Sequence, residues 1–121
     1  MRVMVTGSRD WRNVDVISKA LWGTVGDDMP WNWTLIQGCA TGADAIARSL
    51  ALQMGMQVED YWPDYAAYKF GEANRNRNQL MVASKPDVVL AFPTKRSRGT
   101  WHAVNAAKRA GIEVRILQED E

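Results

Sequence analysis

Short hydrophobic runs recur along this chain, and glycine, proline or polar residues close most of them. They lie at positions 3–5, 34–37, 57–61, 87–92 and 113–117. Short apolar runs bounded by such residues are typical of buried strands. The run at 87–92, Asp-Val-Val-Leu-Ala-Phe, is the most apolar, so it predicts a strand near the centre of a sheet, buried on both faces.

Between these runs the hydrophobic positions follow a helical period. The clearest stripe ends before Gly55 and consists of Ala43, Ile46, Ala47, Leu50, Ala51 and Met54. Further helices are predicted from 14 to about 22, from 73 to 84 and from 99 to 110, whereas 62–72 predicts a loop. In the helix at 73–84, Arg77 shares a face with Met81 and is expected to point inward, while Arg75 points to solvent.

Strands that alternate with helices of this length predict right-handed crossovers and an all-parallel sheet. The expected fold class is therefore α/β, with a Rossmann-like parallel sheet of about five strands and helices on both faces. A length of 121 residues fits a single domain spanning 1–121. The 46% hydrophobic and 24% charged fractions are typical of a globular protein.

The net charge and the numbers of cysteine and histidine residues argue against several classes of protein function. The net charge of +1 argues against a dedicated nucleic-acid binder, which usually carries a marked basic excess. One cysteine and one histidine exclude an intrachain disulfide and a thiolate or multi-histidine metal cluster, so no metal is expected. The apolar run at the N-terminus is too short for a signal peptide, and no run reaches membrane-spanning length. We therefore expect a cytoplasmic protein without membrane contact.

Three loops that follow strands carry the candidate chemistry. Ligands of parallel sheets bind beyond the carboxyl ends of the strands, so these loops are expected to meet at one site. The first loop, taken on its own, favours a plain strand-to-helix turn with a solvated arginine over a ligand clamp. The candidate ligand-binding residues in the three loops are Gly7, Ser8, Arg9, Gly38, Thr41, Gly42, Ala43, Asp44, Pro93, Arg98, Gly99 and Thr100.

The second and third loops each open onto a helix, and backbone N–H groups at a helix start attract phosphate. Asp44 is expected either to cap its helix, with Thr41 as the other candidate cap, or to accept from a ribose hydroxyl. The third loop carries three cations within 95–98, which either face the ligand or form a solvated surface. The aromatic residues Trp62, Tyr65 and Tyr68 either stack on a base or cover the sheet edge.

Four motifs in this order resemble the SLOG superfamily, and its YspA/cpYpsA-related branch most closely. They are residues 5–11 (Val-Thr-Gly-Ser-Arg-Asp-Trp), residues 37–44 (Gln-Gly-Cys-Ala-Thr-Gly-Ala-Asp), Arg77-Asn78 with Met81, and residues 91–100. The resemblance covers nearly the whole chain and implies a Rossmann-like fold and a nucleotide-type ligand. It also implies that Arg77 and Asn78 contact the ligand, with Arg77 as the candidate catalytic residue. No cofactor is implied, and a homodimer is expected because members often dimerise through helices beside the site.

The activity is left open by this resemblance. The LONELY GUY phosphoribohydrolases of the superfamily carry Pro-Gly-Gly-x-Gly-Thr and then a catalytic glutamate, but this chain has Thr94-Lys95 for the glycine pair and Ala103 for the glutamate. An oxocarbenium-like transition state needs a carboxylate, which Asp10, Asp44 or Asp64 would have to supply. We therefore predict a protein that senses, carries or sequesters a nucleotide or nucleotide derivative. The alternatives are an enzyme that cleaves a nucleotide N-glycosidic bond, and a single-stranded-DNA-binding accessory protein similar to DprA.

Overall fold

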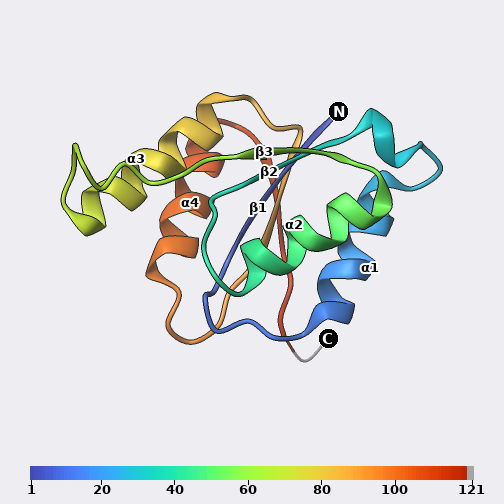
Figure 1. Cartoon of the computed structure of the whole chain (residues 1–121), viewed down its shortest axis with the longest axis horizontal. Helices are drawn as coiled ribbons and strands as arrows, with labels where there is room; N and C mark the ends of the chain where they lie inside the picture. The colour runs from blue at the N-terminus through green and yellow to red at the C-terminus, as the bar shows by residue number, and fades with distance from the viewer. Residues whose placement is uncertain (120–121) are drawn as a thin grey trace.

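The fold is built on one sheet of five parallel strands, in the order β3-β2-β1-β4-β5 (Figure 1). The computed structural model describes residues 1–119. The strands are β1 (Arg2–Gly7), β2 (Thr34–Gln37), β3 (Gln57–Asp60), β4 (Val88–Phe92) and β5 (Glu113–Ile116). This confirms the predicted α/β, Rossmann-like fold. The apolar strand β4 lies between β1 and β5, one place from the middle of the sheet, and all five of its residues are buried.

Two helices cover each face of the sheet (Figure 1). Helices α1 (Val14–Val25) and α2 (Ala43–Met54) pack side by side on one face. Helices α3 (Phe70–Ala83) and α4 (Arg98–Arg109) pack together on the other. The chain runs outward from β1 through β2 to β3 and then crosses back to β4. Strand order therefore reverses between β1 and β4, where open parallel sheets bind their ligands.

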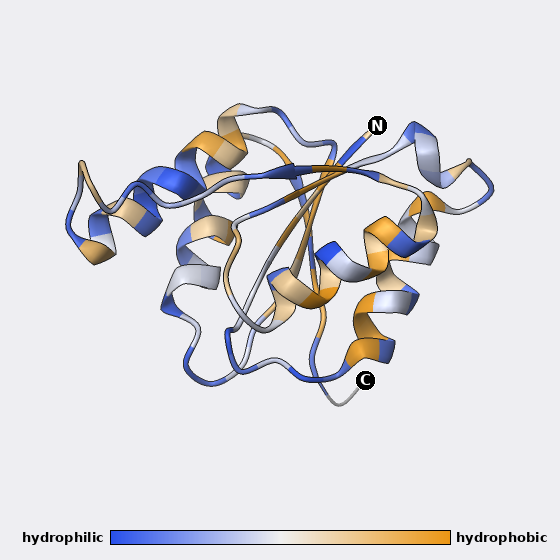
Figure 2. Cartoon of the chain, viewed as in Figure 1, coloured by the Kyte–Doolittle hydropathy of each residue, from blue (hydrophilic) through white to orange (hydrophobic). Residues whose placement is uncertain are grey.

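The alternation of side chains along each strand divides the core into two clusters. Val3 and Val5 of β1 face α1 and α2, whereas Met4 between them faces α3 and α4. Figure 2 shows the central strands largely in the hydrophobic colour and most of α3 in the hydrophilic colour. Helix α3 reaches the sheet mainly through Met81 and Val82, so its earlier turns are left for polar contacts.

Several element boundaries differ from the prediction. Helix α3 begins at Phe70 rather than at 73, so Gly71 lies in its first turn instead of in a loop. The first turn tolerates glycine because its N–H groups have no helical partner in any sequence. Helix α1 continues past position 22 to Val25 and ends at Gly26, whose φ of 59° favours glycine. A 3₁₀ turn, η1 (Pro30–Asn32), was not predicted.

No helix within residues 1–119 combines the length and the hydrophobicity that crossing a bilayer requires.

Candidate functional site

The loops after β1, β2 and β4 meet around Ser8, at the carboxyl edge of the sheet. The Ser8 N–H donates to the Phe92 carbonyl at the end of β4, at 2.9 Å. The Thr94 hydroxyl donates to the Ser8 hydroxyl at 2.7 Å. From the β2 loop, the Ala43 N–H donates to the Ser8 carbonyl at 3.1 Å. The predicted site residues of the three loops therefore share one edge, although their role in ligand binding stays a prediction.

The start of α2 is closed by the loop after β1. Gly42 has a φ of 75°, and a Cβ atom there would lie 2.3 Å from the Ser8 carbonyl oxygen. A Cβ atom on Gly7 would lie 2.4 Å from the Cβ of Ala43. These two glycines are therefore required by the packing of one loop against the other. The N-cap of α2 is Gly42, which has no side chain, so neither Thr41 nor Asp44 is the helix cap.

Asp44 is instead bonded to the loop that precedes α2. Its Oδ2 accepts from the N–H groups of Gly38 and Ala40, at 3.2 and 3.3 Å. Its Oδ1 is buried and has no hydrogen-bond partner within residues 1–119. Burial raises the pKa of Asp44 to about 6, although the nearby Arg77 guanidinium and the two loop amides oppose this shift.

Arg77 links α3 to the loops after β2 and β4. Its Nη1 donates to the Gly38 carbonyl at 2.8 Å, and its Nε and Nη2 donate to Asn78 Oδ1 at 3.2 and 3.1 Å. The Asn78 amide in turn donates to the Gly99 carbonyl at 3.3 Å. The side chain is 9% exposed, which confirms that Arg77 points inward, and exposed Arg75 points to solvent as predicted.

Burial lowers the pKa of the Arg77 guanidinium, whereas the nearby Asp44 carboxylate and Tyr65 hydroxyl oppose that shift. A guanidinium has five N–H donors, and three of them make the bonds to Gly38 and Asn78. Two donors remain outside these bonds. The main role of Arg77 is therefore to hold the β2 loop in place, and only two of its N–H donors remain for a ligand.

The start of α4 is open, in contrast to that of α2. Apart from its chain neighbours and the backbone of its own helix, no atom of residues 1–119 would lie within 4 Å of a Cβ atom on Gly99. The N-cap residue, Ser97, makes no capping bond, because its hydroxyl accepts from the Thr94 N–H at 2.8 Å and so orders the preceding loop. The Arg98 side chain is exposed, whereas Thr100 is buried. First-turn N–H groups lack helical partners, so this end is available to an anion.

Two contributors to this edge were not predicted, namely Ser97 and His102. His102 Nδ1 lies 3.4 Å from the Asn78 amide nitrogen. Burial lowers the pKa of His102, and the charges of Arg75 and Arg109 add to that shift. Helical spacing offered a signal, because His102 follows Gly99 by three positions and so lies on the same side of α4.

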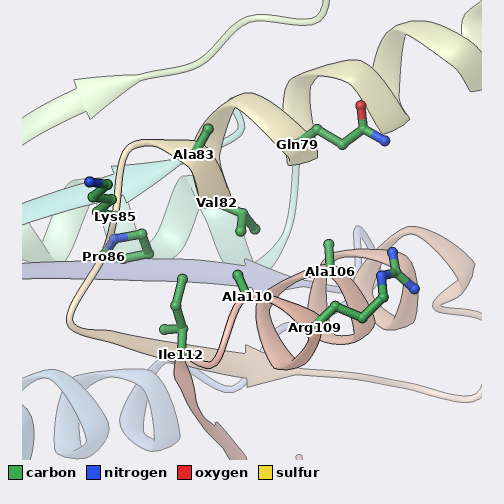
Figure 3. A pocket seen from close by; sticks show the side chains of 9 residues that line it. All are labelled: Gln79, Val82, Ala83, Lys85, Pro86, Ala106, Arg109, Ala110 and Ile112. Carbon is green, nitrogen blue, oxygen red and sulfur yellow. The ribbon is translucent and has the colours of Figure 1, made fainter.

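Two hollows adjoin the sheet, one at each edge. A hollow of about 710 Å³ lies at the carboxyl edge, and its lining residues are Asp10, Pro93, Thr94, Lys95, Arg96, Gln118 and Glu119. A hollow of about 500 Å³ lies between the ends of α3 and α4 and the segment that leads into β4 (Figure 3). Its floor is apolar, with Lys85 and Arg109 beside it, and it contains none of the predicted site residues.

Comparison with known proteins shows the family of this chain. The profile of the YspA, cpYpsA-related SLOG family matches residues 1–68. The chain belongs to this family. A related sequence, the Gene 61 protein of Mycobacterium phage D29, is 35% identical over 120 residues and covers 93% of each chain.

Among solved structures, DNA processing protein A (DprA) from Streptococcus pneumoniae superposes with a TM-score of 0.75 at 17% sequence identity. The match covers 95% of this chain and 49% of the DprA chain, so this chain spans about half the length of that protein. The likeness establishes a shared fold.

Proposed function

We propose that this protein binds a nucleotide or a nucleotide derivative at the carboxyl edge of its sheet, with the phosphate at the start of α4. The observation that carries the proposal is the open space at Gly99 beside the point where strand order reverses. An unobstructed glycine at a helix start lets a phosphate approach the backbone N–H groups closely.

Charges around this point favour an anionic ligand. Arg9 and Arg98 are exposed at the edge, and Lys95 and Arg96 line the adjacent hollow. Guanidinium groups bind phosphate oxygens through paired hydrogen bonds. Two carboxylates lie in the loops of the site. Asp44 is 5% exposed and bonded to loop amides, so its repulsion of a phosphate is attenuated. Asp10 is exposed and lines the adjacent hollow together with Lys95 and Arg96, whose charges oppose its own.

We further propose that binding is not followed by efficient hydrolysis of ordinary nucleoside monophosphates. Ala103, at the position where the similar phosphoribohydrolases carry their glutamate, is fully buried and packs with Met4 and Met81. A glutamate there would place an unpaired carboxyl group in the core, so Ala103→Glu is expected to destabilise the fold rather than create activity. Incubation with AMP followed by chromatography tests this, and release of adenine at ordinary enzymatic turnover would contradict it.

A thermal-shift panel tests the binding itself. The panel contains AMP, ADP-ribose and cyclic dinucleotides, with inorganic phosphate as the reference. A ligand present at a hundred times its dissociation constant adds about 2.7 kcal/mol to the free energy of unfolding, which is readily measured. Arg98→Ala is expected to weaken every positive response, because Arg98 is an exposed cation beside the open helix start. If no nucleotide shifts the unfolding temperature, the proposal fails.

Single-stranded DNA is the second candidate ligand, and the three cations of the β4 loop favour it. Lys95, Arg96 and Arg98 are all exposed. Each phosphate that a protein neutralises on a single strand lowers the slope of log K against log salt by about 0.7. Engagement of all three cations therefore predicts a slope near −2 for an oligonucleotide. Tight oligonucleotide binding with this slope, and no response to free nucleotides, would replace the first proposal with the second.

A further inference from the structure

The segment between β3 and α3, together with the first residue of α3, leaves four aromatic rings in solvent within nine positions. Trp62 is 72% exposed, Tyr65 51% and Phe70 61%, and Tyr68 is exposed as well. None of the four belongs to the two core clusters. These rings therefore do not cover the edge of the sheet. Exposed aromatic side chains gathered in one short segment are candidates for a binding site.

Two of the rings are held in a defined arrangement. Tyr65 and Phe70 stack with an angle of 3° between their planes and 5.4 Å between their centroids. The Arg9 guanidinium lies 5.3 Å from the centroid of Phe70. A stacked pair offers the outer face of a ring that its neighbour holds in place, and such a face matches the shape of a planar heterocycle.

This aromatic pair is connected to the candidate phosphate site from both sides. Arg9 belongs to the loop after β1, which bonds to the other two loops through Ser8. Phe70 begins α3, which carries Arg77 and Asn78, and Asn78 donates to the Gly99 carbonyl at the start of α4. Tyr65 lies close enough to Arg77 for its hydroxyl to influence that guanidinium. Figure 1 shows this segment and the start of α3 reaching out beside the sheet.

We infer that the Tyr65–Phe70 pair is the stacking platform for the nucleobase of the bound ligand. This inference rests on the proposed function and adds the position of the base to that of the phosphate. Every nucleobase has a π-face, so such a platform tolerates different bases. Arg9 stands between the two parts, over the Phe70 ring and at the edge where the phosphate is proposed to bind.

Isothermal titration with AMP and with ribose 5-phosphate tests the platform, because the two probes differ only by the base. Stacking on aromatic side chains predicts that AMP binds roughly 5- to 150-fold more tightly than ribose 5-phosphate. Tyr65→Ala and Phe70→Ala are expected to remove most of this advantage while affinity for ribose 5-phosphate stays unchanged. Tyr65→Phe keeps the ring and is expected to keep the advantage.

Trp22→Ala is the matched control, because Trp22 is an exposed aromatic residue on α1, outside the segment. It is expected to bind both probes like the unmodified protein.

The outcomes separate the platform from the proposed function. If Tyr65→Ala and Phe70→Ala bind AMP as tightly as the unmodified protein, while Arg98→Ala loses both probes, the platform is wrong and the phosphate site stands. If neither probe binds the unmodified protein, both fail. If Phe70→Ala breaks an assembly in sedimentation velocity and leaves AMP affinity unchanged, the rings form a protein interface and the inference is overturned.

Discussion

Helices α2 and α4 begin at the same edge of the sheet, and each has a glycine at its start: Gly42 is the N-cap of α2, and Gly99 is the second residue of α4. At α2, the carbonyls of Ser8 and Arg9 occupy the space beside Gly42, and the Ala43 N–H is bonded to Ser8. At α4, the space beside Gly99 is empty. The same kind of motif thus holds the loops together in one place and leaves a helix end accessible in the other.

Glycine can therefore occur in a strand–loop–helix motif for two different reasons, the requirements of the fold or those of a ligand. Gly42 is required by backbone geometry, because its φ of 75° and its close neighbours both exclude a side chain. No contact among residues 1–119 requires Gly99, so a requirement there, if binding experiments find one, comes from the ligand. Substitutions at the two glycines test this distinction, because one is expected to change the free energy of unfolding and the other the affinity for the ligand.

The largest expected effect is on stability, at the closed helix start. Gly42→Ala is expected to lower the free energy of unfolding by about 3 kcal/mol or more, because strain at a disfavoured φ adds to a clash with two backbone carbonyls. Urea denaturation of the purified variant measures the change. A loss below 1 kcal/mol would show that the loops after β1 and β2 separate easily. The proposed difference between the closed start of α2 and the open start of α4 would then be wrong.

The next effect concerns the support beneath the loops. Arg77→Met is expected to cost about 3 kcal/mol, since it removes charge-assisted bonds to Gly38 and Asn78 and leaves the buried Asp44 without its nearby cation. The control is Arg75→Met, an exposed neighbour on the same helix that is expected to change stability by less than about 0.5 kcal/mol. Equal changes in the free energy of unfolding for the two variants would show that Arg77 does not support the loops.

The buried carboxyl group of Asp44 makes stability depend on pH. Its pKa rises from an ordinary 3.8 to about 6 in the folded protein, so the folded state holds the proton more tightly than the unfolded state. Its contribution to stability is therefore full below pH 4 and is lost as pH rises through 6. At 1.36 kcal/mol per unit of pKa, this loss is at most about 3 kcal/mol.

Asp44→Asn isolates this contribution from those of other carboxylates, because the asparagine stays neutral throughout. The variant is expected to gain stability relative to the unmodified protein as the pH is raised from 4 to 7, measured by urea denaturation at each pH. A stability difference that does not change over this range would mean that Asp44 is ionised in the folded protein without penalty.

The sequence was sufficient to predict most of the fold. Hydrophobic periodicity located all five strands, and continuous apolarity identified the buried strand β4, because strands covered on both faces by helices leave no polar side. The start of α3 was missed because Pro63 and Gly71 are typical of a loop, and the loop was therefore extended to position 72. The inward direction of Arg77 followed from its spacing to Met81.

The site was less predictable, because its contacts join residues far apart in the chain. Nothing in the local sequence distinguishes Gly42, which is closed in by Ser8, from Gly99, which is open. Asp44 was expected to cap its helix or to accept from a ribose hydroxyl, yet it accepts from the amides of Gly38 and Ala40, because the loop before α2 folds back over it. Ser97 is bonded to Thr94, and His102 lies beside the amide of Asn78. The periodicity of hydrophobic residues does not reveal such partners.

The smallest effect on stability, and the sharpest test of the comparison, is at the open helix start. Gly99→Ala is expected to leave stability unchanged or to raise it by up to about 1 kcal/mol, because alanine restricts the unfolded chain and its methyl group meets no neighbour. Gly23→Ala, at another unobstructed helical glycine, is the matched control and should behave alike. The two variants should differ only in binding. The proposed function has the phosphate approach the backbone closely at Gly99, so Gly99→Ala is expected to weaken AMP binding about tenfold, equivalent to about 1.4 kcal/mol. Titration calorimetry on both variants measures this, and unchanged AMP affinity in Gly99→Ala would mean that the phosphate binds elsewhere on the carboxyl edge.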